Sequence, residues 1–449
     1  MKTYRRLFDR LASFENLAAA YHAARRGKRA SAEVARFEIE WEDELLGIRR
    51  DLLAGAYRFG PYREFTVVEP KERKISAAPF RDRVVHHALV RVLEPIYEPR
   101  FVHDTYACRK DRGTHRAVRR CQEFARRHPC VLKADIWKFY FTVDQEALLS
   151  ILGRRVRDAR VLTLVKEILA THDTGTEYYQ PFPGDDLFSP LRPRGIPIGN
   201  LTSQFFANVY LGELDAFAKR VLGVRAYVRY MDDVLLFADD RETLRRWRAA
   251  LAHELIRLRL ALHPTKCHVM STAGGVPFLG FRVMPGRRLL LRSGVRRFVR
   301  RTRRQMRAVE AGQLEPAALT RSVRGWVAHA AFAESLGLRR AIFPRLTWRG
   351  RGGRAETAVP GVAGRLVEQQ HHEPSLRPAQ QQRPDESQQQ QRVSVREDVS
   401  CQSPAGHGEP GRAPDVHGPF PALRGRREQD GSPCGRPAAE ARRPDFIEG

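Results

Sequence analysis

The sequence predicts an α+β fold, with antiparallel strands in the middle of the chain and helices before and after them. The stretch from Val224 to Phe237, VRAYVRYMDDVLLF, places a short polar break between two runs of β-branched and aromatic residues, which is typical of a hairpin. Apolar residues recur with a helical period in residues 1–60, and again from Gly294 to Phe343, where arginine is dense. After Arg349 that periodicity ends and Pro, Gly, Gln and Arg dominate, so we expect a disordered C-terminal tail.

The composition indicates a polyanionic partner. The 449 residues include 79 Lys and Arg against 52 Asp and Glu, a formal net charge of +27, and each phosphate that a cation neutralises releases condensed counterions. A basic surface that serves solubility alone is the alternative. The six cysteines have no CxxC spacing, so we expect a reducing cytoplasm and neither a zinc site nor disulfides. No apolar run is long enough to span a membrane, and the start MKTYRRLFDRLASF is too polar for a signal peptide.

Residues 1–60 are expected to form an N-terminal helical segment. The apolar residues from Phe8 to Tyr21 have the spacing of one amphipathic helix. A second helix is expected to begin after Ser31, a suitable N-cap, and to run toward Gly55. The basic run between the two helices is either a solvated link or an RNA contact.

Two cationic stretches follow in residues 61–130. The first lies on a predicted strand that runs into a helix, and it contains Lys71, Arg73 and Lys74. Such residues either bind phosphate groups or are the ordinary charges of an edge strand. The second stretch contains Arg109 and Arg112 and precedes another predicted helix, an arrangement suited to phosphate binding.

The middle of the chain carries carboxylates at the ends of predicted buried strands. Asp135 ends the apolar run that begins at Val131, and Asp232 and Asp233 occupy the turn of the predicted hairpin. Adjacent like charges are costly, and a divalent cation such as Mg²⁺ is the physical remedy. The alternatives are a solvated turn for the acidic pair and a helix cap for Asp135.

The sequence YMDD from Tyr230 to Asp233, set between two apolar strands, resembles the active-site turn of reverse transcriptases. That resemblance implies a third carboxylate on a neighbouring strand, and Asp135 meets this expectation. Three converging carboxylates can hold two Mg²⁺ ions roughly 4 Å apart, which activate a primer 3′-hydroxyl and stabilise the leaving group. The resemblance therefore implies a right-hand polymerase of fingers, palm and thumb that adds deoxynucleoside triphosphates to a primer on a template RNA.

The resemblance also implies roles for residues that bind the incoming nucleotide. Tyr140, five positions after Asp135, would stack under the sugar and block a 2′-hydroxyl. The cations that would hold the triphosphate are Lys71, Arg73 and Lys74. Lys266 matches a position proposed to protonate the departing pyrophosphate as a general acid, with a surface salt-bridge lysine as the alternative.

A separate group of residues would contact the primer and the template. The turn formed by Phe278, Leu279 and Gly280 resembles the turn that grips the primer end, where glycine permits a close approach of the backbone. Arg109 and Arg112 would contact the nucleic-acid backbone. The arginine-rich helices after Gly294 would follow the hybrid of RNA and cDNA.

The segment IGNLTSQ, from Ile198 to Gln204, narrows the resemblance. Most retroelement polymerases have Gln-Gly followed by Ser-Pro here, whereas this segment resembles the reverse transcriptases of diversity-generating retroelements. The resemblance extends roughly from Phe8 to Phe343 and places Ile198, Gly199 and Gln204 at the nascent base pair. It implies error-prone copying of an adenine-rich template repeat, a small basic accessory protein, and a bacterial, archaeal or phage-encoded origin. The alternatives are a group II intron or retron type of reverse transcriptase, and a catalytically silent RNA-binding protein on a palm fold.

The expected domains follow from these motifs. Residues 61–130 would form the fingers, 131–285 the palm with a fingers-like insertion at about 150–195, and 286–345 the helical thumb. One helix is expected from Glu146 to Leu169. The tail, residues 350–449, is interpreted as an out-of-frame readthrough of a template repeat, because CAA-encoded Gln runs become Asn runs one nucleotide later. A genuine disordered basic tail is the alternative.

Overall fold

An antiparallel sheet of four strands, ordered β4-β5-β3-β6, lies at the centre of the computed structural model. The structure describes residues 2–68, 72–349 and 355–357. Apart from residues 355–357, the tail that was expected to be disordered lies outside this part of the chain. The central strands are β3 Cys130–Asp135, β4 Tyr227–Tyr230, β5 Asp233–Ala238 and β6 His268–Ser271. The predicted hairpin is therefore present as β4 and β5, and the prediction of a mixed fold with antiparallel strands is confirmed.

Both faces of this sheet are buried, each in a different hydrophobic core. Because successive side chains point to opposite faces, Leu132 and Leu236 enter one core while Val131 and Phe237 enter the other. The helices of the first core include α5 Phe80–Tyr97, α10 Leu201–Ala216 and α11 Arg241–Arg257. The second core contains α6 Thr114–Arg127. The continuous apolar composition of the strands is explained by this double burial.

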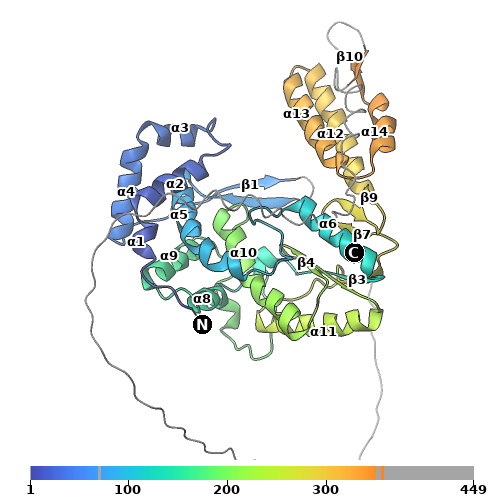
Figure 1. Ribbon diagram of the computed structural model, residues 1–449. Coiled ribbons are helices and arrows are strands. Elements are labelled where there is room, and N and C mark those ends of the chain that lie inside the picture. Colours follow the sequence, from blue (N-terminus) through green and yellow to red (C-terminus); the bar gives the residue numbers. More distant parts are fainter. Residues whose placement is uncertain (1, 69–71, 350–354, 358–449) are drawn as a thin grey trace, which may run out of the picture. The chain divides into compact units, whose positions relative to one another are not determined.

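The N-terminal segment has four helices where two were predicted: α1 Phe8–Leu11, α2 Phe14–Ala24, α3 Ala32–Ile39 and α4 Trp41–Leu53. The first predicted helix is divided at Ser13, whose hydroxyl accepts a hydrogen bond from the Asn16 amide at 3.2 Å and so caps α2. The second is divided at Glu40, which has non-helical backbone angles. Helix α2 packs along α5 (Figure 1).

The single helix predicted from Glu146 to Leu169 was also wrong, because it is divided into α8 Gln145–Gly153 and α9 Ala159–Ala170. Asp158 causes the break. Its side chain accepts from the amides of Arg160 and Val161 at the start of α9, at 3.1 and 3.3 Å. Its other oxygen accepts from the amide of Leu7 at 2.7 Å, so this one carboxylate caps a helix and binds the N-terminal segment.

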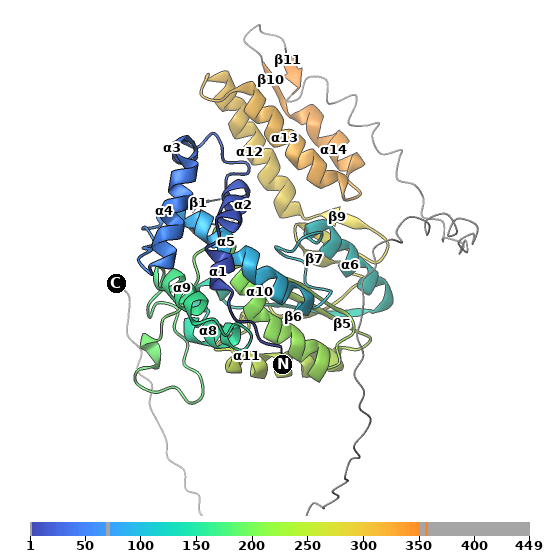
Figure 2. The same ribbon diagram turned by 60° about the vertical axis from the view of Figure 1, so that its left-hand side comes forward.

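The remaining elements form smaller units. Strands β1 Arg63–Val67 and β2 Arg73–Ala77 form one hairpin, and β7 Val276–Phe278, β8 Phe281–Val283 and β9 Arg288–Leu290 form a three-stranded sheet. Figure 2 shows three helices side by side after β9, namely α12 Arg292–Glu310, α13 Pro316–Ala331 and α14 Leu336–Ile342. A last pair of strands is β10 Thr347–Arg349 and β11 Ala355–Thr357. Short irregular turns of helix are η1 Glu98–Arg100, η2 Ser189–Leu191, η3 Phe217–Val221 and η4 Phe343–Arg345.

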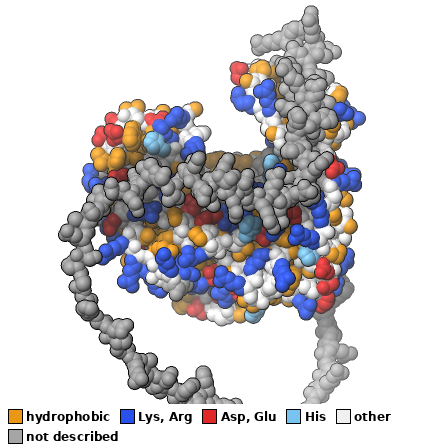
Figure 3. Space-filling view, in the orientation of Figure 1, with side chains coloured by type: hydrophobic (Ala, Val, Ile, Leu, Met, Phe, Trp, Pro, Cys, Tyr) orange, Lys and Arg blue, Asp and Glu red, His pale blue; other side chains and the backbone are white. Residues whose placement is uncertain are grey.

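Two surface properties bear on function. Lys and Arg side chains are spread over the face visible in Figure 3, with Asp and Glu among them, as the net charge of +27 requires. In the part of the chain that the structure describes, none of the helices has the length and apolar character that crossing a membrane requires.

One buried group makes stability depend on pH. Burial, with smaller contributions from His87 and Arg83, lowers the pKa of His86 to about 3, and neither ring nitrogen has a hydrogen-bond partner. The folded protein keeps this imidazole neutral while the unfolded chain protonates it below about pH 6.5, so stability falls as the pH falls through that value. Between pH 7 and pH 5 the loss should be about 2 kcal/mol.

We therefore expect His86→Leu to remove this part of the acid sensitivity. Urea unfolding of the parent and the variant at both pH values measures it. His253→Gln, at an exposed position of α11, is the control and should change nothing. An equal pH dependence in the parent and in His86→Leu would contradict the assignment.

Candidate active site

Three aspartates lie at one end of the central sheet, where β3 and β4 end and β5 begins. Asp135 and Asp233 are direct register partners on neighbouring strands, and Asp232 occupies the turn between β4 and β5. The amide of Ile136 donates to the carbonyl of Asp232 at 3.3 Å, which joins the two chain segments at this point. Burial, then Asp233, then Asp135, raises the pKa of Asp232 to about 6. The structure therefore concentrates negative charge around one half-buried carboxyl group.

Two lysines oppose this charge. The Lys266 Nζ atom lies 3.0 Å from Asp135 Oδ2, and the Lys133 Nζ atom lies 3.4 Å from Asp233 Oδ1. Among the residues that the structure describes, no three His, Cys, Asp or Glu side chains are grouped as a ready-made metal site. The carboxylates thus converge, but two of them are paired with ammonium groups.

Arg73 and Tyr140 belong to the same cluster. Arg73 lowers the pKa of Asp232 and that of Tyr140 by its positive charge, in each case as a minor contribution. The Tyr140 hydroxyl lies 3.5 Å from the sulfur of Met231 in the turn, and burial raises the pKa of Tyr140. The predicted nucleotide ligands Arg73 and Tyr140 are therefore beside the carboxylates.

Lys74 lies apart from them. Successive side chains of a strand alternate between faces, so Lys74 points away from the side that Arg73 takes. It pairs with Glu64 on β1 at 2.6 Å. The structure does not bring Lys74 to the carboxylates, and Lys71 lies outside the described residues.

The segment from Ile198 to Gln204 fixes β2 to the start of α10. The carbonyl of Ile198 accepts from the amide of Ser76 at 3.0 Å. Gly199 has a φ of +116°, and a side chain here would approach Ile75 Cγ2 to 2.8 Å. Ile198 and Gln204 are half-buried, with Gln204 in the first turn of α10.

Asn200 also connects β2 to the start of α10, and the sequence analysis missed this residue. Its amide nitrogen donates to the carbonyl of Ser76 at 2.9 Å, and its oxygen accepts from the amide of Ala78 at 3.4 Å. Asn200 precedes α10 but makes no capping hydrogen bond, so its local pattern suits an ordinary helix cap. Nothing in the sequence shows whether the Asn200 side chain caps α10 or binds the backbone of β2.

Lys133 is a second omission, and here the sequence did carry a signal. A lysine in the apolar run VLKAD is unusual for a buried strand. Besides contacting Asp233, its Nζ atom donates to the carbonyl of Pro277 at 3.1 Å. Lys133 therefore connects the carboxylates to the turn between β7 and β8.

The predicted primer turn lies directly after Pro277. Phe278 is fully buried, whereas Leu279 and Gly280 have φ values of +48° and +90°. A side chain at Gly280 would meet the ring of His329 on α13 at 3.4 Å.

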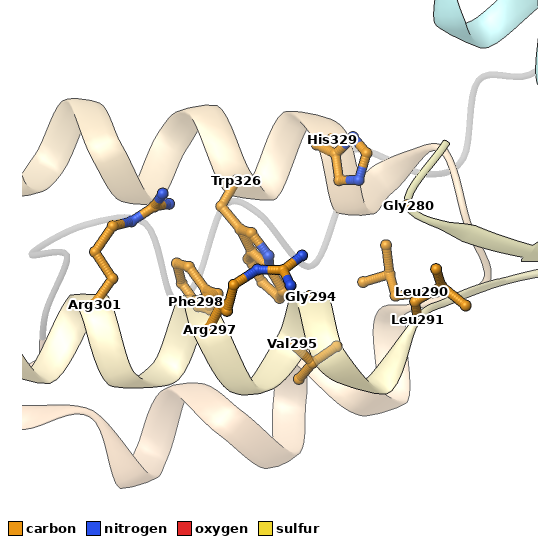
Figure 4. Close-up of a pocket in the computed structure, with 10 residues that line it drawn as sticks. All are labelled: Gly280, Leu290, Leu291, Gly294, Val295, Arg297, Phe298, Arg301, Trp326 and His329. Carbon is orange, nitrogen blue, oxygen red and sulfur yellow. The ribbon is translucent and has the colours of Figure 1, made fainter. Parts of the chain in front are cut away.

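Beyond this turn lies a cavity of about 250 Å³ between α12 and α13. Figure 4 shows Trp326 reaching from α13 toward Phe298 on α12, and the two rings stack 3.7 Å apart.

The two predicted phosphate-binding arginines differ. The side chain of Arg109 is only 5% exposed and pairs with Glu98 at 2.7 Å. It also donates to the carbonyls of Val102 and Thr105 at 2.8 and 2.9 Å, so its charge serves the fold and the structure does not present it to a ligand. Arg112 contacts His103 at an exposed position just before α6.

Comparison with known proteins finds a family model that matches the region containing this geometry. Residues 68–283, which contain Asp135, Asp232 and Asp233, match the family described as reverse transcriptase (RNA-dependent DNA polymerase). Protein YkfC of Escherichia coli (strain K12) is 28% identical over 287 residues, 54% of this chain and 71% of YkfC.

Two relatives are named for introns. Nuclear intron maturase 2, mitochondrial, of Arabidopsis thaliana is 30% identical over 145 residues, which are 29% of this chain and 20% of the maturase. The group II intron-encoded protein LtrA of Lactococcus lactis subsp. cremoris is 24% identical over 180 residues, 39% of this chain and 28% of LtrA. The chain thus covers less than a third of the length of either protein. The chain carries a reverse transcriptase domain, the domain of an RNA-directed DNA polymerase.

Proposed function

We propose that the chain copies a template RNA into cDNA by nucleotidyl transfer at Asp135, Asp232 and Asp233. The observation that carries this proposal is the register of the central sheet, which sets Asp135 opposite Asp233 and beside the turn that holds Asp232. In this proposal residues 61–130, 131–285 and 286–345 act as fingers, palm and thumb. The deoxynucleoside triphosphate enters between Arg73 and Tyr140.

The donor set fits Mg²⁺. Hard cations prefer carboxylate oxygens. Burial raises the pKa of Asp232, and Asp233 and Asp135 raise it further; bound cations would offset the charge of these carboxylates. Asp135, Asp232 and Asp233 would hold them, and Lys266 and Lys133 would have to release their partners first. When bound, two Mg²⁺ ions would activate the primer 3′-hydroxyl and stabilise the leaving group.

The chain's own residues supply the rest of the reaction. Arg73 neutralises phosphate charge, and Tyr140 stacks under the sugar and excludes a 2′-hydroxyl. In this proposal Lys266, an ammonium group 3.0 Å from Asp135, gives a proton to the departing pyrophosphate. Phe278, Leu279 and Gly280 support the primer end, and Lys133 ties that turn to Asp233.

Within this family we propose the diversity-generating type, because the segment IGNLTSQ departs from the Gln-Gly and Ser-Pro pattern of most retroelement polymerases. The template would then be an adenine-rich repeat, and a small basic accessory protein would share the RNA in a bacterial, archaeal or phage-infected cytoplasm. The second candidate is a group II intron type of enzyme, favoured by the similarity to LtrA and to an intron maturase. Sequencing the DNA that flanks the gene distinguishes these two candidates. A nearby adenine-rich repeat that matches a target gene would support only the diversity-generating type.

We expect Ile198→Gln to lower misincorporation several-fold, most clearly opposite template adenine. Ile198 is half-buried beside β2, and its apolar side chain cannot hydrogen-bond the nascent base pair or sugar as an amide could. One such contact is worth on the order of 1 kcal/mol. Arg73 should modulate the same property.

Sequencing cDNAs made on one adenine-containing template measures the effect. Leu191→Gln is the matched control, because Leu191 is 70% exposed in the preceding loop and should leave the errors unchanged. Identical error spectra for the parent and Ile198→Gln would leave Ile198 with a packing role alone.

A further inference from the structure

A fully buried ion pair lies under the turn that carries Asp232. Arg229 on β4 and Asp215 on α10 both have side chains that are 0% exposed. The guanidinium Nε and Nη2 atoms donate to the two Asp215 oxygens at 2.7 Å each. The same carboxylate also accepts from the hydroxyls of Tyr227 at 2.6 Å and Thr105 at 2.8 Å. The orientation of Arg229 is therefore fixed by a carboxylate that is itself held from several sides.

The remaining nitrogen of Arg229 contacts the turn. Its Nη1 atom donates to the carbonyl of Met231 at 3.1 Å and to Asn208 Oδ1 at 3.2 Å. Met231 has a φ of +55°, at the first position of a two-residue hairpin turn, where Gly or Asn is usual. A left-handed non-glycine residue persists only where its surroundings enforce it. The hydrogen bond from Arg229 to the Met231 carbonyl helps to hold Met231 in this conformation.

Stability alone does not account for this pair. Burying two charges costs several kcal/mol per ion, and replacement by apolar residues is often neutral. The pair's contact with the turn has a more specific effect. Arg229 holds the carbonyl of Met231, and the Ile136 amide holds the carbonyl of Asp232 at 3.3 Å. These carbonyls belong to the two peptide units on either side of the Asp232 Cα atom, so together they set the direction of its side chain.

We propose that Arg229, oriented by Asp215, is a positioning residue that aims the Asp232 carboxylate. The proposal rests on the proposed polymerase function and deepens it. It predicts that loss of the Met231 contact lowers turnover while substrate binding is retained. A misplacement of about 1 Å at a reacting group can cost on the order of 100-fold in rate.

Two variants test the role, and a third is the control. Arg229→Lys keeps the charge but cannot hold both Asp215 oxygens and also reach Met231. Arg229→Met combined with Asp215→Leu replaces the pair by apolar groups, so that no unpaired charge is left buried. Thr105→Val removes one hydrogen bond to Asp215 and leaves Met231 untouched. Thermal unfolding establishes a temperature at which each protein is folded, and extension of oligo(dT) on poly(rA) is then measured.

For both Arg229 variants we expect kcat to fall about 100-fold, with KM for dTTP within about threefold of the parent value. Thr105→Val should retain kcat. Near-parental kcat in folded Arg229→Lys would overturn the proposal, because charge alone would then suffice. A rise in KM without a change in kcat would also overturn it.

Amide hydrogen exchange provides a readout that needs no activity. The amide of Ile136 donates to Asp232, so its exchange should accelerate in both Arg229 variants, while the amide of Leu235 in the middle of β5 keeps its protection. Unchanged exchange at Ile136 would refute the positioning role even if primer extension by the parent were absent. Absence of extension by the parent would instead count against the proposed function.

Discussion

Asp232→Asn and Asp135→Asn are each expected to reduce primer extension by on the order of 1,000-fold or more while RNA binding stays within a few-fold of the parent. Each substitution keeps the side chain's shape and removes one negative charge from the cluster at the strand ends. That charge is what would hold the cations, whereas RNA binding depends on the basic surface. We expect a smaller loss for Asp233→Asn, because activity in the family that this chain resembles depends more on the first Asp of the pair.

Single-turnover extension and filter binding of the template RNA measure the two properties. Asp239→Asn is the control, since Asp239 directly follows β5 at its other end and its side chain is 78% exposed. It should leave extension unchanged. Near-normal extension by Asp232→Asn or Asp135→Asn would refute the site.

Gly199→Ala is expected to raise KM for the incoming nucleotide about tenfold or more, because it combines two penalties. A φ of +116° is strained for any residue with a side chain, at a cost of about 1–3 kcal/mol. In addition, the new Cβ atom would come within 2.8 Å of Ile75 Cγ2. Ile75 must shift to relieve this contact, and we expect β2, which carries Arg73, to move with it.

Two further variants separate these penalties. At Gly223 the φ is +66° and an added Cβ atom would have no other atom within 4 Å, so Gly223→Ala reproduces strain without collision and should leave KM unchanged. Ile75→Ala in the Gly199→Ala background removes the collision and should restore part of the nucleotide affinity. Steady-state kinetics with a single nucleotide and thermal unfolding provide the measurements. A parental KM in Gly199→Ala would contradict the prediction, because it would show that β2 and residues 198–204 can shift without loss of nucleotide affinity.

The predictions that held were those carried by short, local patterns. The hairpin and its acidic turn follow from β-forming runs around two adjacent carboxylates, and the position of Asp135 at the end of a strand follows from the apolar run before it. The errors have local causes that periodicity does not reveal. Apolar spacing continues through Ser13 and Asp158, but the side chains of both residues cap new helices.

The partners that the folded chain gives to individual side chains could not be predicted from the sequence. Arg109 has the sequence pattern of a phosphate ligand, but in the folded chain its guanidinium group binds Glu98 and two backbone carbonyls. Asn200 has the pattern of a helix cap, but β2 takes its hydrogen bonds. Lys74 is different, because the alternation of side chains along a strand is enough to separate it from Arg73.

The double burial of the central sheet limits how this enzyme can evolve. Leu132 and Leu236 face one core, Val131 and Phe237 face the other, and the same strands end in the carboxylates. A polar substitution on either side of these strands would therefore damage folding and catalysis together. Heritable change in template preference or accuracy must enter elsewhere, through segments outside these strands: residues 198–204, the stretch around Lys266, and the turn at 278–280.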